Sequence, residues 1–415
     1  MINFSGNFLT FLLLIAFLCA VFFAVNSALN RNSLSRLPRS ELNDTSRFLI
    51  SILIPCRNEQ DNIGKCLDSF LKQTYSNFEI IVLDDESDDD TGNILTQYMA
   101  RHPNISVIQG KPLPEGWTGK NWACHQLYEA SEGEVLLYCD ADTTVDSTLT
   151  NDALAELVKR NLGFITIFPQ RESTNLFDRC VWSFTRWVIA SWVPLWLAYQ
   201  TRTRIFAVGF GQFLMLRRTA YDEIGGYESL RANSLDDFEI ARRIQSSGTQ
   251  WRVYNGIGRL MTVSYQSTKD AVEGYGKSIF PALGSNAFVL LLSWLLLANL
   301  TWTPVLVLVM ESVKIISLST DQLQLASFSV AAVLISWAAA AVKLKISTPM
   351  TVLYPIAITS VLYTSLASYI GIRYGTMMWK NRVIHEADEV LDRAARTTDA
   401  NLESVSDTPA RNSEP

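Results

Sequence analysis

Histidine and paired cysteines are scarce in this sequence. Only three histidines occur in 415 residues, and none of the six cysteines stands in a Cys-x-x-Cys pair. Neither a zinc site with the usual Cys/His spacing nor a disulfide framework is therefore expected. Cysteines without this pattern are typical of proteins that face a reducing compartment such as the cytosol.

Charged residues are also few. They make up 18% of the chain, whereas hydrophobic residues make up 48%. An average soluble protein has about 25% charged residues. The net charge of −6 is concentrated in residues 385–415, which hold eight acidic residues and three arginines. Without a basic surplus, no nucleic-acid partner is expected. The composition predicts membrane segments attached to a soluble part, with a disordered acidic tail over 385–415.

The first long hydrophobic run covers residues 8–25, which carry no charge. Its length is close to the ~20 apolar residues that cross a bilayer. A signal peptide is the alternative, but residues 1–7 lack Lys and Arg, and the run is long for such a peptide. We predict an uncleaved transmembrane anchor over residues 1–30. Arginines after the run predict that the next domain faces the cytoplasm: Arg31, Arg36, Arg39 and Arg47.

Residues 48–280 alternate between short apolar runs and amphipathic stretches. This alternation is typical of an α/β domain with a mostly parallel sheet and helices on both faces. Capping residues predict helices over about 91–101 and 150–160. The predicted strands are 48–55, 78–85, 105–110, 134–142 and 163–170.

Residues 176–200 interrupt this pattern. They contain four tryptophans, two arginines and Pro194, which is too polar for a comfortable membrane span. Tryptophan prefers the headgroup level of a bilayer, so we predict a segment that lies in the membrane plane. The alternative is an ordinary tryptophan-rich core helix.

Residues 281–372 form a second apolar block. Its candidate membrane spans are 283–300, 302–319, 322–342 and 349–371. We favour four separate spans, which together with the anchor give a multi-pass protein of the cell membrane. The alternative is three spans, with the first two candidates joined in one long helix.

Carboxylates stand at the ends of two predicted strands. Asp84 and Asp85 end one strand, and Asp140 and Asp142 end another. In an open α/β sheet, ligands bind beyond the carboxyl ends of the strands. Two acidic groups there repel each other unless a cation is present. Mg²⁺ or Mn²⁺ typically binds one or two carboxylates together with substrate phosphates.

Two further segments carry polar groups of interest. Lys120 follows Gly116 and Gly119 in the segment 113–123, where it offers a charge for a phosphate. The spacing is not that of a Walker A loop, and a solvated surface turn is the alternative. Asp236 and Asp237 begin a predicted helix. There a carboxylate either serves as a general base or only favours the helix start.

The ordered series of motifs resembles the membrane-bound family 2 glycosyltransferases of the GT-A fold, and among them the subgroup acting on hopanoid, carotenoid and ceramide lipids. The motifs are Pro55-Cys56-Arg57-Asn58-Glu59, Asp84-Asp85, Gly116-Trp117-Thr118-Gly119-Lys120, Asp140-Ala141-Asp142, Gly209-Phe210-Gly211-Gln212-Phe213, Arg217-Arg218, Gly225-Gly226-Tyr227, Asp236-Asp237 and Trp379-Lys380-Asn381-Arg382. Asn381 departs from the glycine that many relatives have there.

The resemblance implies a role for each matching residue. Asp84 or Asp85 would hold the base and ribose of a nucleotide-sugar, and Lys120 would approach its diphosphate. Asp142, with Asp140, would hold Mg²⁺ or Mn²⁺. Asp237 would be the general base of an inverting displacement. Pro55, Arg57, Glu59 and Asp140 are further donor-site residues; Asp236, Gly211, Gln212, Trp379 and Arg382 are supporting or acceptor-side candidates.

The function implied is transfer of one sugar from a UDP- or GDP-sugar to a hydroxyl or carboxyl group of a lipid-like acceptor at the cytoplasmic membrane face. A processive polysaccharide synthase is the alternative. Its [QR]-x-x-R-W motif is not evident after Asp237, where residues 274–278 read Gly-Tyr-Gly-Lys-Ser. A non-catalytic membrane scaffold is a second alternative.

Overall fold

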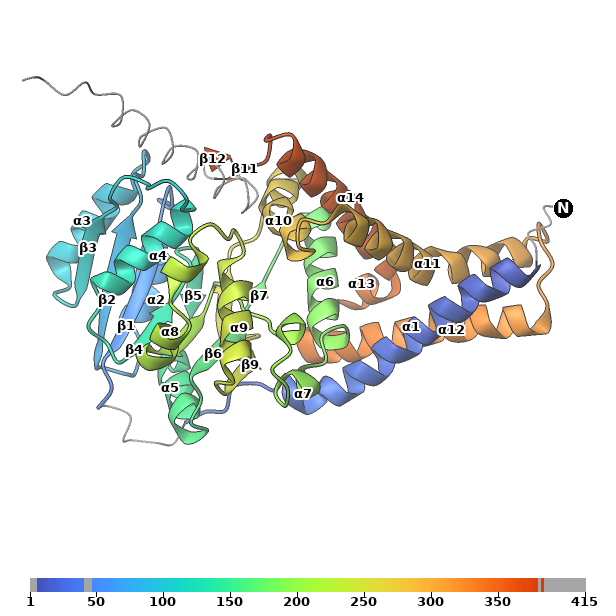
Figure 1. The fold of residues 1–415 in the computed structure, drawn as a ribbon, viewed down its shortest axis with the longest axis horizontal. Coiled ribbons are helices and arrows are strands. Elements are labelled where there is room, and N and C mark those ends of the chain that lie inside the picture. The colour runs from blue at the N-terminus through green and yellow to red at the C-terminus, as the bar shows by residue number, and fades with distance from the viewer. Residues whose placement is uncertain (1–5, 41–46, 380–381, 384–415) are drawn as a thin grey trace, which may run out of the picture.

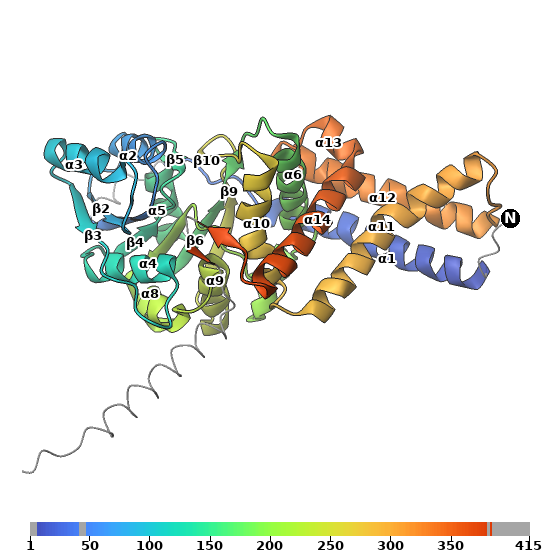
Figure 2. The same ribbon diagram turned by 90° about the horizontal axis from the view of Figure 1, so that it is seen from above.

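The structure is a computed structural model that describes residues 6–40, 47–379 and 382–383. A sheet-containing domain lies at one end, and a long arm of helices extends from it (Figure 1). The same two parts are seen from above in Figure 2. The predicted acidic tail over 385–415 lies outside the described residues, so its disorder stays a prediction.

A seven-stranded mixed sheet organises the domain. Its spatial order is β3 (Ile105–Gln109), β2 (Phe78–Asp84), β1 (Ile50–Cys56), β4 (Val135–Tyr138), β8 (Leu214–Arg217), β6 (Phe164–Phe168) and β9 (Trp251–Asn255). All neighbouring pairs are parallel except those of β8, which is antiparallel to both β4 and β6. The predicted α/β class with a mostly parallel sheet is therefore confirmed.

Side chains that alternate along the strands supply two cores. Ile50, Ile52 and Ile54 of β1 point to one face and join a cluster with residues of α2 (Ile63–Leu71), α3 (Thr91–Arg101) and α5 (Leu149–Lys159). Leu53 points to the other face, toward α4 (Gly119–Glu129) and α9 (Asp236–Ser247). This two-residue alternation allows one sheet to bury both of its faces.

A smaller sheet stands beside the large one. It consists of β5 (Thr143–Val145), β10 (Leu260–Thr262) and β7 (Gln170–Arg171). The predicted strand 134–142 is thus β4 alone, and the Asp140-Ala141-Asp142 segment forms the turn between β4 and β5. The short helix α8 (Arg218–Glu223) follows β8.

Four of the described helices are long and apolar enough to cross a membrane: α1 (Gly6–Ser33), α11 (Ala287–Ser312), α12 (Thr320–Leu344) and α14 (Tyr354–Arg373). The preference for separate spans at 283–300 and 302–319 is wrong, because α11 runs through both ranges with Pro304 inside it. Proline inside a membrane helix is tolerated where neighbouring groups compensate for the lost hydrogen bond. The short α13 (Thr348–Val352) precedes α14.

The tryptophan-rich segment forms α6 (Leu176–Ser191) and α7 (Leu195–Ala198). Helix α6 stands between the sheet and the helical arm, across the long axis of the molecule (Figure 1). Its Trp187 is fully buried, stacks on Trp337 of α12 and donates a hydrogen bond to Ser336 Oγ at 2.9 Å. Trp187 is thus a core side chain, while the placement of the segment in the membrane plane stays a prediction.

Helix α10 (Thr268–Ala282) is the second connector between the two parts, and it packs on α14. One hydrophobic cluster runs without a break from the sheet through α6 to α1, α12 and α14. A core of this kind fixes the domain relative to the helices, because separating the two would expose the shared apolar surface.

Candidate active site

The ends of β1 and β2 form the first part of the site. The strand register pairs Cys56 with Asp84, so the residues that follow both strands lie at the same edge of the sheet. Arg57 Nη1 donates to the carbonyl oxygen of Asp85 at 2.6 Å and lies 3.9 Å from the Asp85 carboxylate. Pro55, Arg57, Asp84 and Asp85 are therefore brought together, as predicted.

The loops at this edge are held in an unusual backbone conformation. Asn58 and Glu86 have φ values of 51° and 55°, which are costly for residues with a side chain. Hydrogen bonds hold them in place: the Asn58 amide donates to Ser87 Oγ at 3.0 Å, and the Ser87 amide donates to Asp84 Oδ1 at 3.1 Å. The edge is thus preformed.

Lys120 links the two other acidic motifs. Its Nζ lies 3.0 Å from Asp140 Oδ1 and 3.2 Å from Asp236 Oδ2. The lysine stands in the first turn of α4, whose start is capped by Thr118. Burial disfavours the charge of Lys120, but Asp140 and Asp236 outweigh it and hold the pKa of the lysine well above its ordinary value.

Asp140 is held from two sides. Besides the contact with Lys120, its Oδ2 accepts a hydrogen bond from Gln212 Nε2 at 3.0 Å. Burial opposes its ionisation, yet Lys120, Lys277 and Gln212 together hold the pKa of Asp140 below its ordinary value. Asp140 is therefore an ionised carboxylate whose oxygens could serve as metal ligands, and Gln212 lies beside it.

A glycine makes this arrangement possible. A Cβ atom at Gly211 would lie 3.1 Å from Lys120 Nζ and 3.2 Å from Asp140 Oδ2. A side chain there would push the ion pair apart. The backbone amide of the same glycine donates to Asp237 Oδ2 at 3.0 Å.

Asp142 is in a different electrostatic state. Its oxygens accept from Thr143 Oγ1 and Thr262 Oγ1, both at 3.3 Å. Burial raises its pKa to about 6, with further repulsion from Asp140 and Glu59, while Arg171 and Lys277 act in the opposite direction. A cation placed between Asp140 and Asp142 would relieve this repulsion.

These two carboxylates fit a Mg²⁺ or Mn²⁺ ion. They supply oxygen ligands, which both ions prefer, and two carboxylates are the usual protein share when phosphates complete the coordination. Among the described residues, no group of three or more His, Cys, Asp or Glu side chains forms a fuller set of ligands. The donor set suits an ion shared with a bound diphosphate.

Asp237 is oriented by two backbone amides. Gly211 N donates to one oxygen at 3.0 Å, and Phe238 N donates to the other at 2.8 Å. Burial raises the pKa of Asp237 to about 7, with repulsion from Asp236, although Lys120 and the two amides favour the ionised form. A carboxyl group with a pKa near neutrality is suited to accept a proton.

The other acids of α9 have structural partners. Asp236 accepts from Tyr227 OH at 3.1 Å as well as contacting Lys120. Glu239 pairs with Arg204 at 2.6 Å and with Arg243 at 3.2 Å. Asp236 therefore supports Lys120, while Glu239 fixes the surrounding chain.

Two cations near the acids were missed from the sequence. Burial and Lys120 lower the pKa of Lys277, while Asp140, Asp236 and Asp142 oppose this. Lys277 of α10 thus interacts electrostatically with Asp140, Asp142 and Asp236. Arg171 of β7 acts on Asp142 and lies 3.6 Å from Asp178. A sequence signal for Lys277 is its place in the segment 274–278, which occupies the region of the [QR]-x-x-R-W motif of processive synthases.

Trp379 and Arg382 belong to a small hairpin of β11 (Met378–Trp379) and β12 (Arg382–Val383). Strand β11 contacts α10, close to which Figure 1 also places the hairpin. The side chains of Trp379 and Arg382 lie outside the described part of the chain, so their predicted roles stay predictions.

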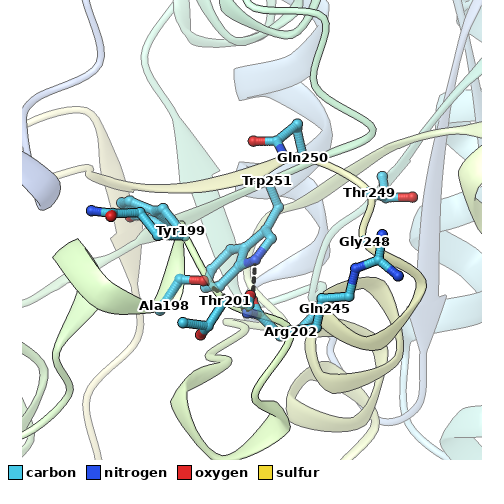
Figure 3. A pocket seen from close by; sticks show the side chains of 10 residues that line it. Ala198, Tyr199, Thr201, Arg202, Gln245, Gly248, Thr249, Gln250 and Trp251 are labelled. Atoms are coloured by element: carbon cyan, nitrogen blue, oxygen red, sulfur yellow. Dashed lines mark hydrogen bonds between the residues drawn. The ribbon is translucent and has the colours of Figure 1, made fainter.

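A small pocket of about 160 Å³ lies away from these acids, between α7, the end of α9 and β9 (Figure 3). None of the predicted site residues lines it. Its Gln245 accepts from Trp251 Nε1 and donates to the Ala198 carbonyl oxygen at 2.8 Å. These hydrogen bonds link α7 to α9 and β9 of the sheet-containing domain.

Comparisons with known proteins agree on one kind of protein. Residues 51–225 match Glycosyl transferase family 2. A relative from Staphylococcus haemolyticus, named 4,4'-diaponeurosporenoate glycosyltransferase, is 22% identical over 261 residues, which are 62% of this chain and 67% of the relative. A relative of the same name from Staphylococcus aureus is 25% identical over 264 residues, with the same shares of 62% and 67%.

Two solved structures are also similar. Mannosyltransferase PcManGT from Pyrobaculum calidifontis, in complex with GDP-Man and Mn2+, has 15% sequence identity and a TM-score of 0.49, covering 86% of this chain and 98% of that one. S. aureus TarS 1-349 in complex with UDP has 16% identity and a TM-score of 0.39, covering 79% and 91%.

The tight fit at Gly211 leads to a prediction. Gly211→Ala should displace the Lys120–Asp140 pair and lower kcat/KM by about tenfold or more, since small displacements in a site are costly. Steady-state kinetics with the nucleotide-sugar varied would measure it. Gly64→Ala is the matched control, because a Cβ there would make only ordinary contact with the Tyr98 side chain, whose nearest atom is Oη at 3.4 Å. Equal kinetics for the two variants would contradict the reading of Gly211.

Proposed function

We propose a lipid glycosyltransferase function for this chain, starting from the fact that residues 51–225 form a family 2 glycosyltransferase domain. The predicted family, its GT-A type of α/β domain and the glycosyltransferase class of enzyme are thereby confirmed. The finer proposal is inverting transfer of one sugar from a nucleotide-sugar to a lipid-like acceptor at the cytoplasmic face of a multi-pass membrane protein.

One observation carries the proposal. The acid with a pKa near 7, Asp237, is connected through Gly211 to the Lys120–Asp140 pair. A proton acceptor is thus placed next to a cation and a carboxylate that suit a metal diphosphate. This is the set of groups that a displacement at a sugar carbon requires.

The donor would be bound along the edge of the sheet. Asp84 and Asp85 would hold the ribose and base beside Arg57, in the preformed loops at the ends of β1 and β2. Lys120 would exchange part of its contact with Asp140 for the diphosphate. Lys277 adds a second positive charge over the same acids, which suits the charge that develops on the leaving group.

Asp140 and Asp142 would hold a Mg²⁺ or Mn²⁺ ion, with Glu59 close enough to affect Asp142. Such an ion, when bound, neutralises the charge of the departing nucleoside diphosphate. Burial, together with repulsion from Asp140 and Glu59, raises the pKa of Asp142, and the repulsion that a bound cation would relieve supports this part of the proposal.

Asp237 would act on the acceptor. It takes the proton of an acceptor hydroxyl while the acceptor oxygen forms a bond to the sugar C1. The bond between C1 and the diphosphate oxygen breaks on the opposite side, and the nucleoside diphosphate leaves with the electron pair. A carboxylate acceptor is already deprotonated, so it would need Asp237 less.

The acceptor class is supported by the position of the site and by the relatives. Helices α6 and α10 join the catalytic domain directly to helices that are apolar enough to cross a membrane. The named relatives act on a carotenoid carboxylic acid, as the name diaponeurosporenoate says. The arginines after α1 support a cytoplasmic catalytic domain.

A transfer assay tests the proposal. Purified protein in detergent would receive radiolabelled UDP- or GDP-sugars, Mn²⁺ and a lipid extract of the source cells, with the lipid phase then counted and analysed by mass spectrometry. We expect one sugar to be added per lipid. Asp237→Asn should lower transfer to a hydroxyl acceptor by about 10²–10⁴-fold.

Asp270→Asn is the matched control, because Asp270 is an exposed acid on α10 and should leave transfer unchanged. Polymeric products would contradict transfer of a single sugar. Full transfer to a hydroxyl acceptor by Asp237→Asn would remove Asp237 from its proposed role.

The raised pKa of Asp237 predicts a pH dependence. The base must be ionised, and its pKa is about 7. With a hydroxyl acceptor and saturating Mn²⁺, kcat/KM should therefore rise about tenfold per pH unit below pH 7 and level off above it. A pH–rate profile measures this. A profile that is level down to pH 5 would contradict it, and Asp237→Asn should lack this limb.

A further inference from the structure

A groove of about 350 Å³ opens on the helical arm, apart from the acidic site. Its lining comes from three helices: Phe177 of α6, Trp302 of α11, and Ile356, Thr359, Ser360 and Tyr363 of α14. The volume is at the lower end of the range for small-molecule pockets, about 300–1,000 Å³.

The groove is apolar and firmly built. Trp302 Nε1 donates to Thr359 Oγ1 at 3.1 Å, which ties α11 to α14. The rings of Phe177 and Tyr363 meet edge to face, with centroids 6.0 Å apart. Thr359 and Ser360 direct their hydroxyl groups to carbonyl oxygens of their own helix. The surface that remains suits a hydrocarbon chain.

The location of the groove decides where its occupant comes from. Both α11 and α14 are apolar enough to cross a membrane, and Ile356 and Tyr363 are 48% and 58% exposed. A groove on such helices opens to lipid rather than to water. Its occupant is therefore a hydrophobic chain that is dissolved in the membrane.

In the sequence of α6, the groove residue Phe177 stands next to a member of a buried polar cluster. Asp178 follows Phe177 in α6, is fully buried, accepts a hydrogen bond from Tyr275 OH at 2.6 Å and lies 3.6 Å from Arg171. Arg171 acts in turn on Asp142.

Two polar atoms of this cluster, which consists of Asp178, Arg171 and Tyr275, are buried and have no hydrogen-bond partner in the described chain. They are Asp178 Oδ2 and Arg171 Nε. Buried polar atoms without partners are rare and costly. A polar group of a ligand within hydrogen-bonding distance of these two atoms would supply the missing hydrogen bonds.

We infer that the groove at Phe177, Trp302 and Ile356–Tyr363 binds the apolar chain of the acceptor, so that its polar end reaches the acids past Arg171 and Tyr275. This inference rests on the proposed function and adds the route by which the acceptor enters. The acceptor class is then a single extended hydrocarbon chain that ends in a hydroxyl or carboxyl group.

Filling the groove tests the inference kinetically. Ile356→Trp should raise the KM for a long-chain acceptor at least tenfold, with a smaller effect on kcat. Ile335→Trp on α12 is the matched control, because Ile335 is 61% exposed and does not line the groove. Thermal unfolding in detergent would show that both variants fold. An unchanged KM in Ile356→Trp would overturn the inference.

Photolabelling provides a readout that does not depend on transfer. The probe is palmitic acid carrying a diazirine, with labelled peptides identified by mass spectrometry. Label should concentrate on the peptides that contain Phe177 and 356–363, and the lipid extract that contains the acceptor should displace it. Equal labelling of α1 and α12, which contribute no residue to the groove, or displacement by phosphatidylglycerol alone, would overturn the inference as ordinary lipid contact.

The two proposals fail in different ways. If wild-type protein transfers no sugar to any lipid, the proposed function fails whatever the labelling shows. If wild-type protein is active and Ile356→Trp behaves like Ile335→Trp, only the groove assignment fails.

Discussion

The site depends on one lysine that lies between two acidic motifs. Lys120 contacts Asp140, from the turn after β4, and Asp236, from the start of α9. These acids are nearly a hundred residues apart in the chain. Without the lysine, the buried carboxylates would repel each other. Gly211 is small enough to lie against the pair, and its amide holds Asp237. One cation thus sets the positions of the proposed metal ligand and the proposed base together.

A shared apolar core joins the domain to the helical arm. The apolar cluster continues from the sheet into α6, α1, α12 and α14, so the acidic site keeps a fixed position relative to the helices that are apolar enough to cross a membrane. Asp178 is a buried polar residue within α6. Asp178 accepts a hydrogen bond from Tyr275 and lies beside Arg171, whose charge favours the ionised form of Asp142.

Much of this was predictable because local sequence determines it. Apolar strands followed by acids predicted the sheet edge at Asp84 and Asp140, and capping residues predicted a helix over about 91–101, where α3 lies. Features that arise from tertiary contacts were not predictable. Lys277 and Arg171 carry no local motif and reach the acids only through packing. Pro304 suggested a break that α11 does not have, and no local pattern indicates that Trp187 of α6 stacks on Trp337 of α12. Trp379 and Arg382 matched a motif, but their side chains lie outside the described residues.

The most direct test of the central claim is the binding of nucleoside diphosphate by isothermal titration calorimetry. UDP and GDP would be titrated into wild-type protein and Lys120→Ala, with and without Mn²⁺. The account predicts that one nucleotide binds wild-type protein in a Mn²⁺-dependent manner, and that Lys120→Ala weakens this binding by about tenfold or more, which is about 1.4 kcal/mol. Equal affinity of the two proteins, or binding that does not change with Mn²⁺, would contradict it.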